Sequence, residues 1–272
     1  MTLTEERKPR RLRLRYPASC VGCGIALSKG AEAVWDPSTK TVTCLACIPA
    51  SQVDAGAPGA SAAAAGVRRA DRRFDEARRK YGDHAAEVAR EMANRDAAAS
   101  WGKGSDGESR LAGYIAREIG DGVIALHDRL IPGTRSNIDH IFVSPTGVWV
   151  VDAKAYTGKV SRRESGPLWR RDNELYIGGR NRTSLAKGIR RQVDATNAAL
   201  RGDESLHGTD INAALCLVAS EWALFDFPFQ LGNVWVMYPG ALKKRLRKRG
   251  PLSRETMERI ARRLSLSLPP AR

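Results

Sequence analysis

Residues 137–154 constrain the fold more than any other stretch, because they read as two strands joined by a tight turn. Both halves, 138–143 and 148–151, are rich in β-branched and aromatic residues, and the break between them holds Pro145 and Gly147. Pro and Gly between two such runs indicate a β-hairpin. The strongly apolar flanks place this hairpin in a buried sheet.

The hairpin brings three charged side chains together. If Val143 pairs with Val148, counting outward along both strands places Asp139 opposite Asp152. The side-chain period of two puts Lys154 on the same face as Asp152. Cross-strand partners bring their Cβ atoms within about 5 Å of each other. We therefore expect two carboxylates and an ammonium group to converge at one end of the sheet.

Such a cluster has a recognisable chemistry. Two carboxylates held this close repel each other, and a divalent cation with a preference for oxygen ligands, such as Mg²⁺, removes that cost. Acids that hold a metal and a lysine that steers the attacking water are the parts needed for metal-assisted phosphodiester hydrolysis. The alternative is a surface hairpin on which Lys154 only neutralises two acids. The apolar flanks favour the functional interpretation, since buried carboxylates are candidates for functional sites.

Three blocks of the sequence resemble a known family. They are GE at 107–108, NIDHIFVSPTGVWVVDAKAYTGKV at 137–160, and a later helix containing Gln192. Together they resemble the nuclease-related domain (NERD), a member of the PD-(D/E)xK nuclease superfamily. Two positions depart from the superfamily pattern: Ile138 stands in place of Pro, and Asp152 stands where many relatives carry Glu.

The resemblance covers about residues 105–240 and implies a fold and an activity. The expected fold is α/β, with a mixed central sheet flanked by helices as in restriction endonucleases. The expected activity is that of a nuclease dependent on Mg²⁺ or Mn²⁺. Asp139 and Asp152 would hold the catalytic metal and Lys154 would position the water.

Glu108 and Gln192 enter the site through the resemblance. Glu108 shares a helical face with Leu111, Ile115 and Ile119, which points it toward the sheet. The motif S-x-x-E at 105–108 fits a capping box equally well. The family carries an acidic residue on its first helix, which implies that Glu108 binds the metal or its water. In related nucleases a glutamine like Gln192 orients water or contacts phosphate, whereas by chemistry alone it is a polar residue on a helix.

A second metal site is predicted near the start of the chain. Cys20 and Cys23 form one C-x-x-C pair and Cys44 and Cys47 form another, with the twenty residues 24–43 between them. This spacing is the signature of a structural zinc site with four thiolates. The segment resembles a zinc ribbon, and a segment this short needs the metal to fold. Two disulfides are one alternative, disfavoured in a reducing cytoplasm, and a redox-active thiol pair is a more remote one.

Composition divides the chain into five expected parts. An alanine-, glycine- and serine-rich stretch, SQVDAGAPGASAAAAG, reads as a flexible spacer. The helical pattern that follows it breaks at Gly82 and carries many arginines. The expected parts are a basic arm (1–16), the zinc ribbon (17–49), the spacer (50–65), a charged helical connector (66–99) and a NERD-type nuclease domain with a basic helical tail (100–272).

The formal net charge of +15 and the isoelectric point near 10.1 favour a polyanionic partner, nucleic acid ahead of a membrane. We expect DNA as the favoured partner, no association with a membrane, and a cytoplasmic location, because no signal peptide or transmembrane run is seen. Basic residues interleaved with aromatics at 162–182, and the run 243–249, suit a phosphate backbone or a solvated surface equally well.

Two other functions stay open. One is a nucleic-acid-binding or adaptor protein whose nuclease fold is weak or silent. The other is a protein-interaction module that depends on zinc and uses the ribbon or the helical connector to bind a partner. Cleavage tests with and without divalent metal separate the first from a nuclease, and Cys44→Ser tests the second.

Overall fold

A computed structural model describes residues 9–48, 53–83, 87, 107–166, 172–201, 203–223 and 227–271 of the chain. The start of the predicted basic arm, the C-terminal part of the helical connector and the capping-box serine lie outside these residues. Among the described helices, none combines the length and the apolar composition needed to cross a bilayer.

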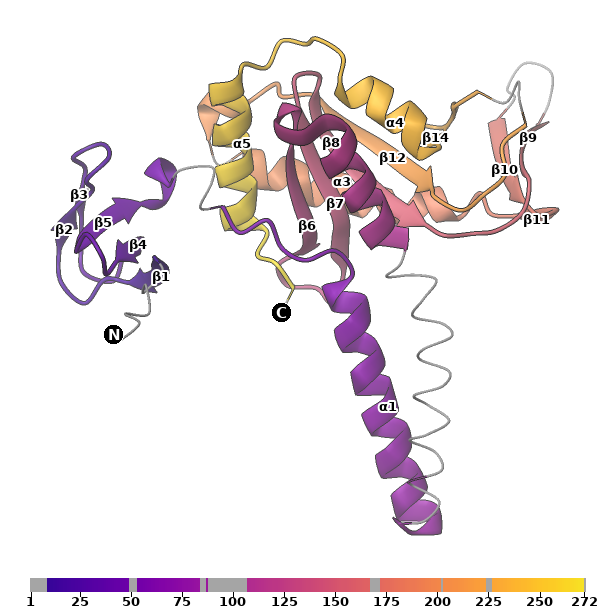
Figure 1. Cartoon of the computed structure of the whole chain (residues 1–272), viewed down its shortest axis with the longest axis horizontal. Coiled ribbons are helices and arrows are strands. Elements are labelled where there is room, and N and C mark those ends of the chain that lie inside the picture. Colours follow the sequence, from indigo (N-terminus) through magenta and orange to yellow (C-terminus); the bar gives the residue numbers. More distant parts are fainter. Residues whose placement is uncertain are drawn as a thin grey trace, which may run out of the picture.

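The centre of the molecule is a six-stranded mixed sheet with the order β13-β14-β12-β8-β7-β6 (Figure 1). Its strands are β6 (Ile124–Leu130), β7 (Asn137–Ser144), β8 (Gly147–Lys154), β12 (Ile211–Leu217), β13 (Phe229–Leu231) and β14 (Val234–Met237). Strand β12 runs parallel to both β8 and β14, and the other pairs are antiparallel. The expected mixed α/β fold is confirmed.

The central hairpin has the predicted register, with Val143 paired to Val148 and His140 to Val151. Alternating side chains send Val148 and Val150 into one core and Trp149 and Val151 into another, so the sheet is buried on both faces. Continuous apolar strands are what a sheet covered on both faces requires.

Helices cover the two faces of this sheet (Figure 1). The core on one face includes residues from α3 (Leu185–Leu200) and α5 (Arg254–Ser267). The core on the other face includes residues from the helix at 107–119 and from α4 (Pro239–Leu246). The short 3-10 helices η3 (Gly120–Gly122) and η4 (Glu204–Leu206) connect elements. A small antiparallel sheet of β9 (Val160–Ser165), β10 (Asp172–Ile177) and β11 (Arg180–Asn181) adjoins the main one.

The cysteine-rich segment folds as two small antiparallel sheets. One has the order β1-β4-β5 and the other pairs β2 with β3. Their strands, with the 3-10 helix that follows, are β1 (Arg10–Arg13), β2 (Ala18–Ser19), β3 (Ala26–Leu27), β4 (Glu32–Asp36), β5 (Thr41–Cys44) and η1 (Leu45–Cys47). Strands β4 and β5 form a hairpin that turns across 36–40, with Val34 paired to Thr43. This segment lies beside α5, which η1 contacts (Figure 1).

Helix α1 (Ala60–Tyr81) projects from the end of the sheet where β7 begins (Figure 1). It starts within the stretch that composition marks as a spacer, because the alanines there have the highest helix propensity of all residues. It ends at Gly82, where the break was expected, and Gly82 has a φ of 86°. The segment before it, from residue 53 onward, runs against β6.

Candidate active site and metal centres

Asp139, Asp152 and Lys154 lie together where β7 begins and β8 ends. One step beyond the pairing of His140 with Val151, the register puts Asp139 beside Asp152. The Lys154 Nζ atom is 3.5 Å from Asp139 Oδ2 and forms a closer ion pair with Asp152 Oδ1. The structure thus brings two carboxylates and one ammonium group into a single cluster.

The cluster is largely shielded from solvent, since Asp139 and Asp152 are each 7% exposed. Burial, followed by the charge of Asp152, raises the pKa of Asp139 well above its usual range. Burial alone would lower the pKa of the Lys154 ammonium group, but the two carboxylates outweigh it and raise that pKa above its usual value. Lys154 therefore stays protonated at neutral pH.

Glu108 reaches the same end of the sheet from the helix at 107–119. Gly107 allows a close approach there, because a Cβ at this position would lie only 3.0 Å from the Ala155 Cβ. Glu108 is 8% exposed and its Oε2 atom is buried without a hydrogen-bond partner. Burial, and then the charge of Asp128, raises the pKa of Glu108 to about 7, against the opposing charge of Lys154.

The donor set suits a hard divalent cation, which prefers carboxylate and carbonyl oxygens. The unpaired Glu108 Oε2 supports this fit, because a buried oxygen without a partner is costly and rare. The acids are nevertheless less tightly grouped than the cysteines, which within the described residues are the only group of three or more such side chains placed closely enough to hold a metal ion by themselves. A cation here would keep some of its own waters, as Mg²⁺ commonly does.

Gln192 lies on α3, which packs against β8 and β12. Its Oε1 atom is buried and has no hydrogen-bond partner. Among the described residues, no recorded hydrogen bond joins its side chain to Asp139, Asp152 or Lys154. The structure therefore places Gln192 on a helix that packs against the site-bearing strand β8.

The side chains of His140 and His127 lie apart from Asp139 and Asp152, because strand alternation turns His140 to the face opposite Asp139. Their Nδ1 atoms are 2.9 Å apart, and His140 stacks on Phe142 in the core on the opposite face. Burial lowers the pKa of both rings, that of His127 to about 4. The pair is a part-buried, neutral contact between β6 and β7.

Asp128 and Asn137 are residues that sequence reasoning missed. Asp128 is fully buried and has a φ of 48°, unusual for a residue with a side chain. Its Oδ1 atom accepts a 2.8 Å hydrogen bond from Asn137 Nδ2, which is also 3.5 Å from Asp139 Oδ1. The available signal was the pair Asp128-Arg129, two charged residues that directly continue an apolar strand.

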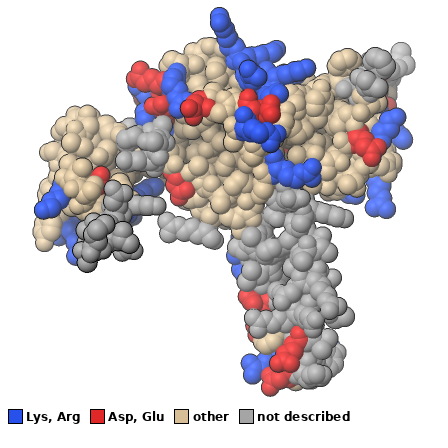
Figure 2. Space-filling model, in the orientation of Figure 1, with Lys and Arg blue, Asp and Glu red and all other residues tan. Residues whose placement is uncertain are grey.

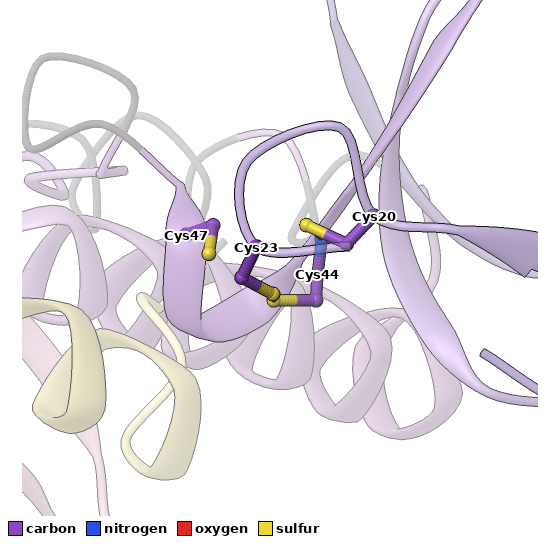
Figure 3. Close-up of side chains that lie close together, drawn as sticks. All are labelled: Cys20, Cys23, Cys44 and Cys47. Atoms are coloured by element: carbon purple, nitrogen blue, oxygen red, sulfur yellow. Dashed lines mark hydrogen bonds between the residues drawn. The ribbon is translucent and has the colours of Figure 1, made fainter. Parts of the chain in front are cut away.

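The four cysteines converge at the other centre (Figure 3). Their sulfur atoms all lie within 4.8 Å of one another, and Cys23 Sγ is 3.7 Å from Cys44 Sγ. That distance is well beyond the roughly 2.05 Å of a disulfide bond. Backbone N–H groups of Gly22 and Cys44 donate to Cys20 Sγ. The arrangement could hold a metal ion with four thiolates.

Electrostatics at the thiol cluster favour a thiolate at one position. Burial raises the pKa of Cys20, but hydrogen bonds from the backbones of Cys44, Cys23 and Gly22 outweigh this effect and bring the pKa to about 6. Burial and the neighbouring thiols raise the pKa of Cys47 to about 12. Four thiols this close to one another cannot all become thiolates unless a cation compensates the negative charge. A bound metal ion provides that compensation. Cys216 is buried in the main sheet and takes no part.

Comparison with protein families decides the identity of the acid-bearing segment. Residues 103–218 match the family model described as the nuclease-related domain, NERD. This segment is a nuclease-related domain. Comparison with curated proteins and with solved structures gives no significant match.

The nuclease-related domain contains all five candidate residues of the acid site: Glu108, Asp139, Asp152, Lys154 and Gln192. It includes strands β6, β7, β8 and β12. Helix α1 and the cysteine-rich segment precede the match, while α4 and α5 follow it. The expected family resemblance is confirmed for this segment.

Proposed function

We propose that this protein is a Mg²⁺- or Mn²⁺-dependent nuclease that hydrolyses phosphodiester bonds, in DNA rather than RNA. One observation carries the proposal: within a nuclease-related domain, Asp139, Asp152 and Lys154 form a buried cluster that Glu108 approaches from a helix. A nuclease-related fold makes nucleic acid the natural partner, and the charge of +15 agrees with it.

Each residue has a role in this proposal. Asp139 and Asp152 hold the cation, the carbonyl of Ala153 offers a further oxygen, and Glu108 binds the cation or its water. A bound divalent cation stabilises the charge that develops on the phosphate and lowers the pKa of water. A water oxygen bonds to phosphorus as the bond from phosphorus to the leaving oxygen breaks; the attacking water gives up a proton to solvent and the leaving oxygen takes one up from solvent.

The raised pKa of Lys154 favours a role in orienting the water over a role as proton acceptor. A lysine that stays protonated orients the attacking water and stabilises developing negative charge, but it is a poor proton acceptor. Gln192 Oε1, buried without a partner, is suited to accept a hydrogen bond from a water in the site.

Basic surfaces supply contacts for the phosphate backbone. Figure 2 shows lysines and arginines gathered over α4 and the loop after it. Exposed members of this group are Lys244, Arg247, Lys248 and Arg249. On the small sheet, the Arg163 guanidinium lies 4.0 Å from the centre of the Tyr176 ring, a basic and aromatic pair that suits backbone and base contacts.

The four cysteines bind zinc in a structural role in this proposal. Four thiolates close the coordination shell of Zn²⁺, so this ion is not the catalytic one. A protein partner binds through the ribbon or the helical connector in this proposal.

An adaptor with a silent nuclease fold is the second candidate. It is favoured by the ion pairs of Lys154 with both Asp139 and Asp152, which neutralise much of the acid charge without a cation. In that case the protein binds nucleic acid and does not cleave it.

Cleavage assays decide between the two. The zinc-loaded protein is incubated with labelled double- and single-stranded DNA and RNA in Mg²⁺, Mn²⁺ or EDTA, beside the Asp152→Asn variant. A nuclease cleaves only with divalent metal, and Asp152→Asn reduces the rate by at least about a hundredfold, since removing a transition-state contact commonly costs that much. Retained DNA binding with no cleavage by the wild-type protein in either metal establishes the adaptor.

A further inference from the structure

The segment before α1 is fixed to β6 rather than free of it. The N–H of His127 donates a 2.6 Å hydrogen bond to the Ala55 carbonyl. The fully buried Arg129 donates a 2.8 Å hydrogen bond to the Asp54 carbonyl. At Gly56 a Cβ would lie 2.2 Å from the His127 carbonyl oxygen, so the two backbones are in direct contact.

This attachment points the start of α1 at the acids. The N–H groups at the beginning of a helix have no acceptor within the helix, and the positive end of its dipole attracts anions. The Ser61 N–H donates to Asp128 Oδ2. An acid from the nuclease-related domain therefore satisfies an N–H in the first turn of a helix that lies outside it.

The same contacts continue to the metal-binding acids. Asp128 holds Asn137 through its other oxygen, and Asn137 Nδ2 is also 3.5 Å from Asp139 Oδ1. On the Glu108 side, Oε2 is left buried and unpartnered. A chain of contacts thus runs from Ser61 through Asp128 and Asn137 to Asp139.

We propose that the first turn of α1 is part of the active-site scaffold: Ser61, acting through Asp128 and Asn137, holds Asp139 in position for the cation. Asp128 is a positioning residue, and the nuclease-related domain alone lacks this support. The inference rests on the proposed function, because it assigns Asp139 to metal binding. Hydrogen-bonding partners of metal ligands commonly change metal affinity by about 10- to 100-fold when removed.

The test measures Mn²⁺ binding to the full, zinc-loaded chain by titration calorimetry. Ser61→Pro removes the N–H that reaches Asp128, and proline is tolerated in the first turn of a helix. Asp128→Asn removes the negative charge of that acceptor. We expect both variants to bind Mn²⁺ at least about tenfold more weakly, whereas Ser61→Ala, which keeps the N–H, binds as the wild type does. Weaker Mn²⁺ binding by Asp152→Asn shows that the ion binds at the acid site.

Hydrogen exchange followed by mass spectrometry gives a readout independent of activity. By reciprocity of coupled equilibria, Mn²⁺ should slow exchange at residues 56–63 in the wild type but not in Asp128→Asn or Ser61→Pro. Thermal unfolding of each variant checks that the fold persists. Wild-type affinity in both variants, with Mn²⁺ still protecting 56–63, overturns the inference and leaves the proposed function standing. A wild-type protein that binds no Mn²⁺ overturns both.

Discussion

Lys154 determines how the acid cluster is compensated when no cation is bound. Its ammonium group pairs with Asp139 and Asp152, which are both largely buried. Removing one partner of a buried ion pair leaves uncompensated charge and costs about 3–5 kcal/mol. A divalent cation can replace the lost charge, so stability and metal binding should be linked at this residue.

Lys154→Met tests that link. We expect the variant to unfold at a lower temperature than the wild type in EDTA, because two carboxylates lose their counter-charge. Added Mn²⁺ should raise its melting temperature by more than that of the wild type, since ligands that bind only the folded state stabilise it. Thermal scans with a Mn²⁺ series measure both effects. Equal Mn²⁺ shifts in the two proteins would contradict a cation site beside Lys154.

The pair of His127 and His140 makes the free energy of unfolding depend on pH. Burial is the largest cause that lowers the pKa of His127 to about 4, with Arg129 adding to it and Asp128 opposing it. A histidine in the unfolded chain has a pKa of about 6.5. Below that pH the unfolded chain binds a proton that the folded chain excludes, so the unfolded state is favoured.

We therefore predict that His127 lowers the stability as the pH falls from about 6.5 towards 4, by up to about 1.4 kcal/mol per pH unit for the excluded proton. His140 contributes in the same direction, because burial also lowers its pKa, whereas the raised pKa values of Glu108 and Asp139 act in the opposite direction. His127→Gln should remove the contribution of His127 from the slope. Urea unfolding of both proteins at several pH values measures it, and parallel slopes would exclude His127 as a cause.

At the scale of elements, the contact between residues 53–61 and β6 depends on backbone shape. Gly56 has a φ of 72° and touches the His127 carbonyl, while Gly82 has a φ of 86° with nothing within 4 Å of an added Cβ. The two glycines share a conformation that side chains avoid, but only Gly56 is also in close contact. Alanine substitution at the two positions therefore separates the cost of backbone strain from the cost of a steric clash.

Gly56→Ala should destabilise the protein by about 2–3 kcal/mol, and Gly82→Ala by on the order of 1 kcal/mol from strain alone. Chemical unfolding gives the two values. Hydrogen exchange should show faster exchange at 53–61 in Gly56→Ala only. Similar losses in both variants would mean that the contact with His127 contributes little.

At the scale of the whole molecule, short sequence patterns predicted the features that depend on residues close together in the chain. The register of the hairpin followed from residues 137–154 alone, and the two C-x-x-C pairs marked the thiol cluster. The features that the sequence did not predict depend on contacts between residues far apart in the chain. Strand β6 extends through Asp128 because distant segments satisfy its polar groups: Ser61 binds the Asp128 carboxylate, and Ala271 binds its carbonyl. No periodicity within either segment encodes that contact.

The cysteine-rich segment and the main sheet should respond differently to loss of metal. The segment has few buried apolar side chains, among them Leu14, Ala33 and Ile48, whereas the main sheet is covered on both faces. Small domains of this kind depend on their metal for folding, because the metal supplies free energy that the core does not. Chelation of zinc should thus unfold residues 9–48 and leave the sheet folded.

Hydrogen exchange in the presence of a zinc chelator tests this expectation. Amides in β4 and β5 should lose protection, while amides in β7 and β8 keep it, and Cys44→Ser should reproduce the pattern without chelator. Cys216→Ala is the matched control, because Cys216 lies in the main sheet and away from the cluster. Because η1 contacts α5, protection at the α5 surface should fall slightly as well. Retained protection in β4 and β5 after complete zinc removal would show that the segment folds without its metal.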